Sequence, residues 1–197
     1  MTRRLLQLYA GLTLYGVSMA LQIRAGLGLD PWDVFHQGVS DKTGLSFGTI
    51  VIITGALVLL AWIPLRQWPG IGTVSNVIVI GVVVDIALGL IDDVHGLPLQ
   101  LAFLTAGVVL NAVAGAAYIG AGLGPGPRDG LMTGLVRTTR GSVGVIRTSI
   151  EVSVLAIGFA LGGTVGLGTV VYALSIGPLL QVFMPAFAIK QPAYAVQ

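Results

Sequence analysis

Apolar positions dominate the chain and gather in six long runs, separated by short polar or glycine-rich stretches. A helix needs about 20 residues, at about 1.5 Å per residue, to cross the hydrocarbon core of a bilayer. Each run is close to that length, so we expect six transmembrane helices. The runs cover residues 5–23, 46–65, 71–91, 97–120, 143–161 and 167–187.

Two shorter segments, residues 31–42 and 127–138, also carry helix signals. In the first, Asp30 is a suitable N-cap, Pro31 occupies the favoured first position, and Gly44 ends the segment. About 12 residues extend only roughly 18 Å, which is too short for a hydrocarbon core of about 30 Å. We therefore expect each segment to be a re-entrant helix, or to lie along the membrane surface.

The chain repeats itself without gaps at an offset of about 96 residues, so that AGLG at 25–28 returns at 121–124 and Asp33 matches Asp129. We expect one membrane domain built from two repeats, residues 1–96 and 97–197. Three crossings per repeat is an odd number, which inserts the second repeat upside down, as in many transporters. The predicted fold is thus an all-α polytopic membrane protein: six transmembrane helices plus two short re-entrant helices, as an inverted internal repeat (3+3).

Basic residues support this orientation mildly, because cytoplasmic loops are enriched in Lys and Arg. With a cytoplasmic N-terminus, only Arg24 and Lys42 would lie outside. The basic residues expected inside are Arg3, Arg4, Arg66, Arg128, Arg137, Arg140 and Lys190. If the short helices crossed the membrane, this bias would be weaker.

The composition limits which partners the protein can bind and which chemistry it can perform. The chain is 55% hydrophobic and 9% charged, against about 25% charged residues in soluble proteins, so the expected environment is the lipid bilayer. The net charge of +2 is small and scattered, which argues against nucleic acid, and a homo-oligomer is left open. There is no cysteine, and no residue cluster suggests a metal, a cofactor or a catalytic nucleophile. We therefore expect a protein that is not an enzyme.

The first candidate site follows the repeated turn, GLGLDPWD in one half and GLGPGPRD in the other. A helix N-terminus after such a turn points unpaired N–H groups and a positive dipole end at whatever lies before it. Two inverted copies would face each other near the midplane. In the alternative reading, the aspartates only cap their helices and the glycines only permit close packing. The candidate substrate-binding residues here are Gly28, Asp30, Asp33, His36, Gly124, Arg128 and Asp129.

Other candidates are polar residues inside the apolar runs, where a charge costs about 2.5–3.5 kcal/mol on insertion. Asp85 is the one ionised residue of the third run, and its repeat equivalent is Gln181. We expect Asp85 to face a cavity. Arg147 and Glu151 are spaced i,i+4 and can pair with each other, either as a structural salt bridge or as a gate or binding group.

The stretches AGLGLDPWDVFHQGVSDKTGLSFGT, PLRQWPGIGTVSN, GPGPRDGLMTGL and RTSIEV resemble the YczE-like bacterial membrane proteins, within the wider YczE/YyaS/YitT group. The resemblance covers nearly the whole chain. It implies a multi-pass protein of the bacterial plasma (inner) membrane. It supplies no catalytic residue to transfer.

The leading functional hypothesis is a transporter or channel-like carrier of a small solute, with a central site between the two repeats. The helix N-termini suggest an anionic solute, whereas the acidic residues suggest coupling to protons or cations. A second hypothesis is an accessory or regulatory membrane protein that acts through partners and has a tightly packed interior. A third is a lipid-handling protein, which a lateral opening would indicate.

Overall fold

The computed structural model describes residues 1–189. Its secondary structure over that part of the chain consists of helices, and these coincide with the six long runs and the two short segments to within a few residues. The all-helical prediction is therefore confirmed. The helices are α1 (Thr2–Ala25), α2 (Pro31–Thr43), α3 (Phe47–Trp62), α4 (Ile71–Leu90), α5 (Leu97–Gly120), α6 (Pro127–Thr139), α7 (Val143–Ala160) and α8 (Leu167–Phe187).

Four helices among the described residues, α4, α5, α7 and α8, are long and apolar enough to cross a membrane. Helix α3 has only 16 residues, and it follows α2 after a bend of 116°, so that α2 and α3 together form a fifth candidate. Helix α1 is long enough, at 24 residues, but contains several arginines and glutamines. The protein is thus helical with four or five candidate spans, and the six-span layout stays a prediction.

The short helices begin and end as the cap residues indicate. The Asp30 carboxylate accepts hydrogen bonds from the amides of Trp32 (2.8 Å) and Asp33 (3.0 Å). At the other end, Gly44 adopts the left-handed conformation with φ 73°, which glycine tolerates at a helix C-terminus. In the second copy glycine replaces the capping aspartate, and α6 has no side-chain cap.

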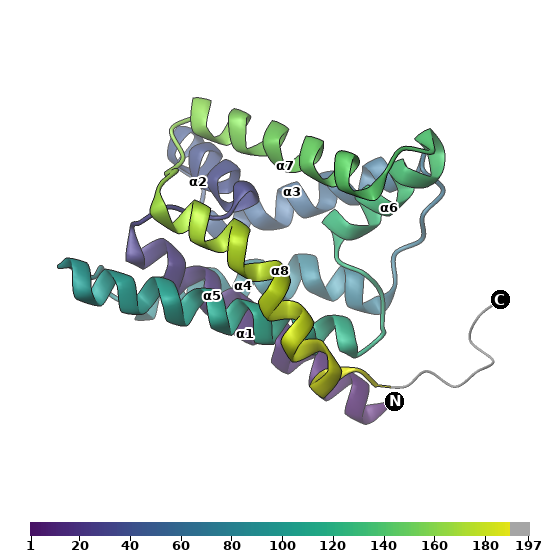
Figure 1. Ribbon diagram of the computed structural model, residues 1–197, viewed down its shortest axis with the longest axis horizontal. Helices are drawn as coiled ribbons and strands as arrows, with labels where there is room; N and C mark the ends of the chain where they lie inside the picture. Colours follow the sequence, from purple (N-terminus) through teal and green to yellow (C-terminus); the bar gives the residue numbers. More distant parts are fainter. Residues whose placement is uncertain (190–197) are drawn as a thin grey trace.

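The helices form two layers (Figure 1). Helices α1, α4, α5 and α8 make one layer, with α1 against α5 at its centre, and α2, α3, α6 and α7 make the other. Helices α1 and α5 approach each other closely at two glycines that are repeat equivalents. A Cβ on Gly11 would lie 2.8 Å from the amide of Tyr118, and a Cβ on Gly107, the repeat equivalent of Gly11, would lie 3.1 Å from the carbonyl of Ser18.

The repeated GLG turns pack reciprocally. The amide of Gly168, at the start of α8, donates to the carbonyl of Leu27 at 2.7 Å, and the amide of Gly72, at the start of α4, donates to the carbonyl of Leu123 at 2.8 Å. Each turn therefore holds the last helix of the other half. The turns need glycine because Gly28 has φ 108° and a Cβ there would lie 2.5 Å from a backbone nitrogen of the α8 start.

The two halves differ at one interface. Helix α3 packs closely on α4, whereas no comparable interface joins α7 to α8. The small residues that allow the first contact, Gly48 and Gly81, have glycine equivalents at Gly144 and Gly177. Around these two equivalents a Cβ would meet nothing within 4 Å. The second half thus carries equivalents of these two glycines, but its two helices are apart at them.

Candidate functional site: a polar pocket between the layers

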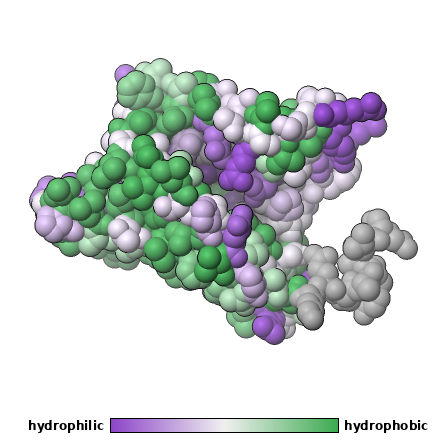
Figure 2. Space-filling view, in the orientation of Figure 1, coloured by the Kyte–Doolittle hydropathy of each residue, from purple (hydrophilic) through white to green (hydrophobic). Residues whose placement is uncertain are grey.

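A pocket of about 400 Å³ lies between the two layers. The N-terminal ends of both short helices reach it, through Asp30 and Pro31 of the first and Gly126 and Pro127 of the second. Figure 2 shows the entrance as a hollow with hydrophilic atoms at its bottom and apolar surface above and below. Both helix starts are buried, with Asp30, Gly126 and Pro127 shielded from solvent.

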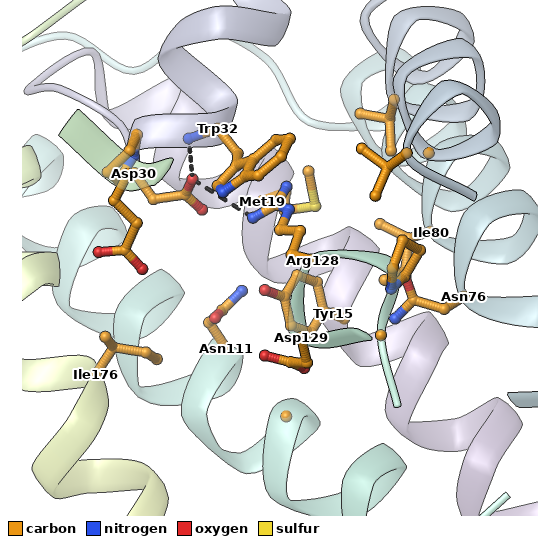
Figure 3. Close-up of a pocket in the computed structure, with 18 of the residues that line it drawn as sticks. Tyr15, Met19, Asp30, Trp32, Asn76, Ile80, Asn111, Arg128, Asp129 and Ile176 are labelled. Carbon is orange, nitrogen blue, oxygen red and sulfur yellow. Dashed lines mark hydrogen bonds and ion pairs between the residues drawn. The ribbon is translucent and has the colours of Figure 1, made fainter. Parts of the chain in front are cut away.

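Arg128 is the central charge of the pocket (Figure 3). Its guanidinium lies 3.7 Å from the carboxylates of both Asp30 and Asp33, and 4.9 Å from the centre of the Trp32 ring. Both carboxylates are almost completely buried. Asp33 also contacts the buried ring of His36, at 3.1 Å between Oδ1 and Nδ1. One guanidinium therefore faces two buried carboxylates, so this cluster has room for one further positive charge or proton.

Asp129 also lines the pocket and forms no ion pair within residues 1–189. Its nearest polar side-chain contact is the hydroxyl of Tyr118, which donates at 3.4 Å. Tyr118 makes an edge-to-face contact with Tyr15, at 6.1 Å between ring centres. Tyr172 completes this aromatic wall and donates to Asn111 at 3.1 Å. Asp129 is thus an acceptor with unused capacity, and its tyrosine neighbour Tyr118 belongs to this aromatic wall.

Arg147 and Glu151 stand at the entrance on α7. The Nε of Arg147 lies 3.1 Å from Glu151, and the two side chains are 58% and 41% exposed. The i,i+4 pair expected from the sequence is therefore present. Both residues line the pocket.

The structure brings most of the sequence-predicted site residues together. Those that line the pocket are Asp30, His36, Arg128, Asp129, Arg147 and Glu151, and Asp33 lies directly behind Asp30. Arg128, which the charge count assigned to a cytoplasmic loop, lies inside the pocket instead, so it is no marker of orientation. Lys190 lies outside the described residues.

Gly28, Gly124 and Asp85 do not line the pocket, contrary to expectation. The two glycines are packed against the starts of α8 and α4, where their role is close backbone approach. Asp85 instead binds the N-terminus of α3: it accepts from the Ser46 hydroxyl at 2.5 Å and from the amide of Gly48 at 2.7 Å. A carboxylate at this helix end is stabilised by the unpaired amides and the helix dipole.

Sequence reasoning missed several pocket residues, notably Tyr15, Asn111 and Tyr118. A signal was present in the repeat. Tyr15 and Asn111 are repeat equivalents, and both line the pocket. A polar pair at matched depth in the two halves is therefore a usable signal, although Gln22, the equivalent of Tyr118, does not line the pocket. Over residues 1–189, no group of three or more His, Cys, Asp or Glu side chains is placed to hold a metal ion.

An all-helical chain with several apolar spans and a buried polar pocket defines an integral membrane protein. Comparison with known proteins agrees. Residues 2–185 match the profile of the "Family of unknown function (DUF6198)", and the chain belongs to that family.

Curated relatives support the same grouping. The chain is 38% identical over 177 residues to an "Uncharacterized protein" of Haemophilus influenzae, covering 90% of this chain and 81% of the relative. It is 34% identical over 191 residues to the "Uncharacterized membrane protein YczE" of Bacillus subtilis, covering 95% and 88%. It is 25% identical over 179 residues to YyaS of the same organism, covering 89% of each. The resemblance to YczE-like proteins is thus confirmed, and no solved structure matches the chain.

Proposed function

We propose that the protein is a carrier built from two inverted repeats, residues 1–96 and 97–197, which moves a small solute through the pocket. In this proposal the six long helices cross the plasma membrane, α2 and α6 are re-entrant, and the N-terminus is cytoplasmic. The reciprocal contacts of the two GLG turns support the two-fold relation. The position of α2 and α6 at opposite ends of the bundle supports the inversion (Figure 1).

The observation that carries the proposal is the unequal state of two equivalent interfaces around one pocket. On one side α3 and α4 are closed, through Gly48 against Gly81 and through Asp85 on the start of α3. On the other side α7 and α8 are apart, and pocket-lining residues of both helices are exposed. Inverted-repeat carriers alternate access by exchanging the states of their two halves.

The second half carries groups that would allow α7 to dock on α8. Gly144 and Gly177 occupy the places of the two packed glycines, and Gln181 occupies the place of Asp85. Gln181 is exposed here, and its amide oxygen can accept from the α7 N-terminus as Asp85 does from α3. We infer that α7 docks on α8 in the alternate state while α3 leaves α4.

The charges of the pocket favour a positively charged solute, or coupling to a proton or cation, over the anion that the helix ends suggested. The N-terminus of α2 is already occupied by its own Asp30. Acidic groups in and behind the pocket outnumber the two arginines. They are Asp30, Asp33, Asp129 and Glu151, against Arg128 and Arg147.

Uptake by proteoliposomes of a panel of radiolabelled amines, amino acids and carboxylates tests the carrier proposal, with Gly144→Ala as the decisive variant. A Cβ on Gly144 meets nothing within 4 Å in this structure, so stability is expected to stay unchanged. In the docked state it would collide with the Gly177 carbonyl, because a Cβ on Gly48 collides with that of Gly81.

We expect Gly144→Ala to abolish uptake and Gly89→Ala, which also meets nothing within 4 Å, to keep it. Equal uptake by both variants, or no uptake of any solute by the wild type, would contradict the proposal. The accessory-protein hypothesis expects a tightly packed interior, which a pocket of about 400 Å³ does not favour.

A further inference from the structure

The pocket opens sideways, between two helices whose outer faces suit lipid. Helices α7 and α8 are candidate membrane spans, and large apolar side chains on them are exposed, including Phe159 at 65% and Leu174 at 72%. The space between α7 and α8 therefore leads from the pocket toward the acyl chains rather than only toward water. A solute with an apolar part can use this route.

The space between α7 and α8, called the slot below, changes from apolar at its outer end to polar at its inner end. At the lip, apolar side chains, Ile150 of α7 with Ile176 and Leu180 of α8, line the walls beside the Arg147–Glu151 pair. At the bottom lie the polar groups Asn111, Arg128 and Asp129 (Figure 3). A molecule that matches both parts has a polar head at the bottom and an alkyl chain between the two helices.

The sign of the head follows from the pairing of the charges. Arg128 is shared by Asp30 and Asp33, and Arg147 is paired with Glu151, so that of the carboxylates lining the pocket Asp129 alone has no ion pair within residues 1–189. An anionic head would meet this carboxylate without a free cation to balance it. A cationic head would supply the missing partner.

The aromatic residues of the pocket favour an ammonium ion in particular, and one of them, Tyr118, contacts Asp129. Tyr15, Tyr118 and Tyr172 line the pocket together with Trp32. Aromatic faces attract quaternary ammonium groups, and a set of such faces is a recurring recognition site for them.

We propose that this pocket binds an amphiphile with an ammonium head group, which enters laterally between α7 and α8, places its head against Asp129 and Tyr118, and leaves its alkyl chain in the slot. This inference rests on the proposed function, because it names the substrate class of the same pocket. It identifies the ligand by its chemistry, an alkylammonium, and not by a source.

A single-cysteine protection assay tests the proposal, since the chain has no cysteine of its own. Ala173→Cys places a thiol on the pocket wall, and Leu174→Cys places one on the adjacent lipid-facing position. Both variants are reconstituted in nanodiscs and labelled with a permeant maleimide. The added probes are decyltrimethylammonium, tetramethylammonium or decyl sulfate.

We expect decyltrimethylammonium to slow labelling of Ala173→Cys about tenfold at saturation and to leave Leu174→Cys unchanged. Adding Asp129→Asn should raise the concentration needed for protection about tenfold, as loss of roughly 1.4 kcal/mol of binding free energy requires. Tetramethylammonium, which lacks the chain, and decyl sulfate, which has the wrong charge, should protect weakly. Equal protection by decyl sulfate, equal protection by tetramethylammonium, or indifference to Asp129→Asn would overturn the proposal.

The result of the protection assay can be distinguished from the result of the transport assay that tests the carrier proposal. Protection with the expected selectivity, combined with no movement of radiolabelled decyltrimethylammonium across proteoliposomes beyond the protein-free rate, would uphold the ligand class and remove transport. Uptake of a different solute without any protection by decyltrimethylammonium would uphold transport and remove the ligand class.

Discussion

Asp85 is expected to hold the closed interface of the first half, and its removal should release α3 from α4. The carboxylate binds two groups at the start of α3, the Ser46 hydroxyl at 2.5 Å and the Gly48 amide at 2.7 Å. A hydrogen bond to a charged group stabilises by about 1.5–3 kcal/mol, and a negative charge at a helix N-terminus adds about 0.3–1 kcal/mol.

Because Asp85 is partly exposed, water replaces part of each interaction when the carboxylate is removed, so we take less than the sum of these terms. Asp85→Ala should weaken docking by about 2–3 kcal/mol, which shifts the docking equilibrium about 30- to 140-fold. Asp85→Asn keeps an oxygen for the Gly48 amide, so its cost should be about 1 kcal/mol, or roughly fivefold.

Disulfide trapping in proteoliposomes measures this equilibrium. A Cβ built on Gly55 lies 3.3 Å from the Cβ of Val77, close to the spacing of a disulfide, about 3.5–4.5 Å. The pair Gly55→Cys and Val77→Cys should therefore cross-link rapidly in the closed interface. We expect the rate to fall in the order wild type, Asp85→Asn, Asp85→Ala, with exposed Asp92→Ala as an unchanged control. An undiminished rate in Asp85→Ala would refute the role of this carboxylate.

Three further changes have expected results that thermal unfolding in detergent can measure. Arg128→Met leaves two buried carboxylates unpaired and should destabilise by about 3–5 kcal/mol. Trp62→Phe removes the indole N–H that donates to the Pro127 carbonyl at 3.0 Å and should cost about 1 kcal/mol. Arg147→Gln breaks an ion pair whose partner, Glu151, is 41% exposed, so stability should change by less than about 0.5 kcal/mol, while uptake falls. A large loss of stability in Arg147→Gln would show a structural role instead.

Helix positions could be predicted from the sequence because hydropathy and cap residues act locally. The long runs became helices, and Asp30, Pro31 and Gly44 set the ends of α2 as their chemistry requires. The polar residues of the two turns also met at one pocket, as the duplicated pattern indicated. These features depend on neighbours in the chain or on the repeat itself.

The difference between the two interfaces could not be predicted, because the sequence makes both possible. Gly48 and Gly81 have matching glycines at Gly144 and Gly177, although Glu151 stands where the first half has Gly55. A further difference is Asp85, whose negative charge binds the α3 N-terminus, whereas the neutral Gln181 provides a weaker acceptor for α7. Composition assigned Asp85 to a cavity because an ionised group in an apolar helix needs a partner. The partner proved to be a helix end, which tertiary packing alone determines.

The most direct test of the exchange between the two interfaces is a second cysteine pair, Glu151→Cys with Ala173→Cys. These positions are the repeat equivalents of Gly55 and Val77, and they meet only when α7 docks on α8. Oxidation in proteoliposomes should cross-link this pair, and the locked protein should no longer cross-link Gly55→Cys with Val77→Cys. Failure of the second pair to cross-link under conditions that trap the first completely, or simultaneous formation of both cross-links in one molecule, would contradict the exchange.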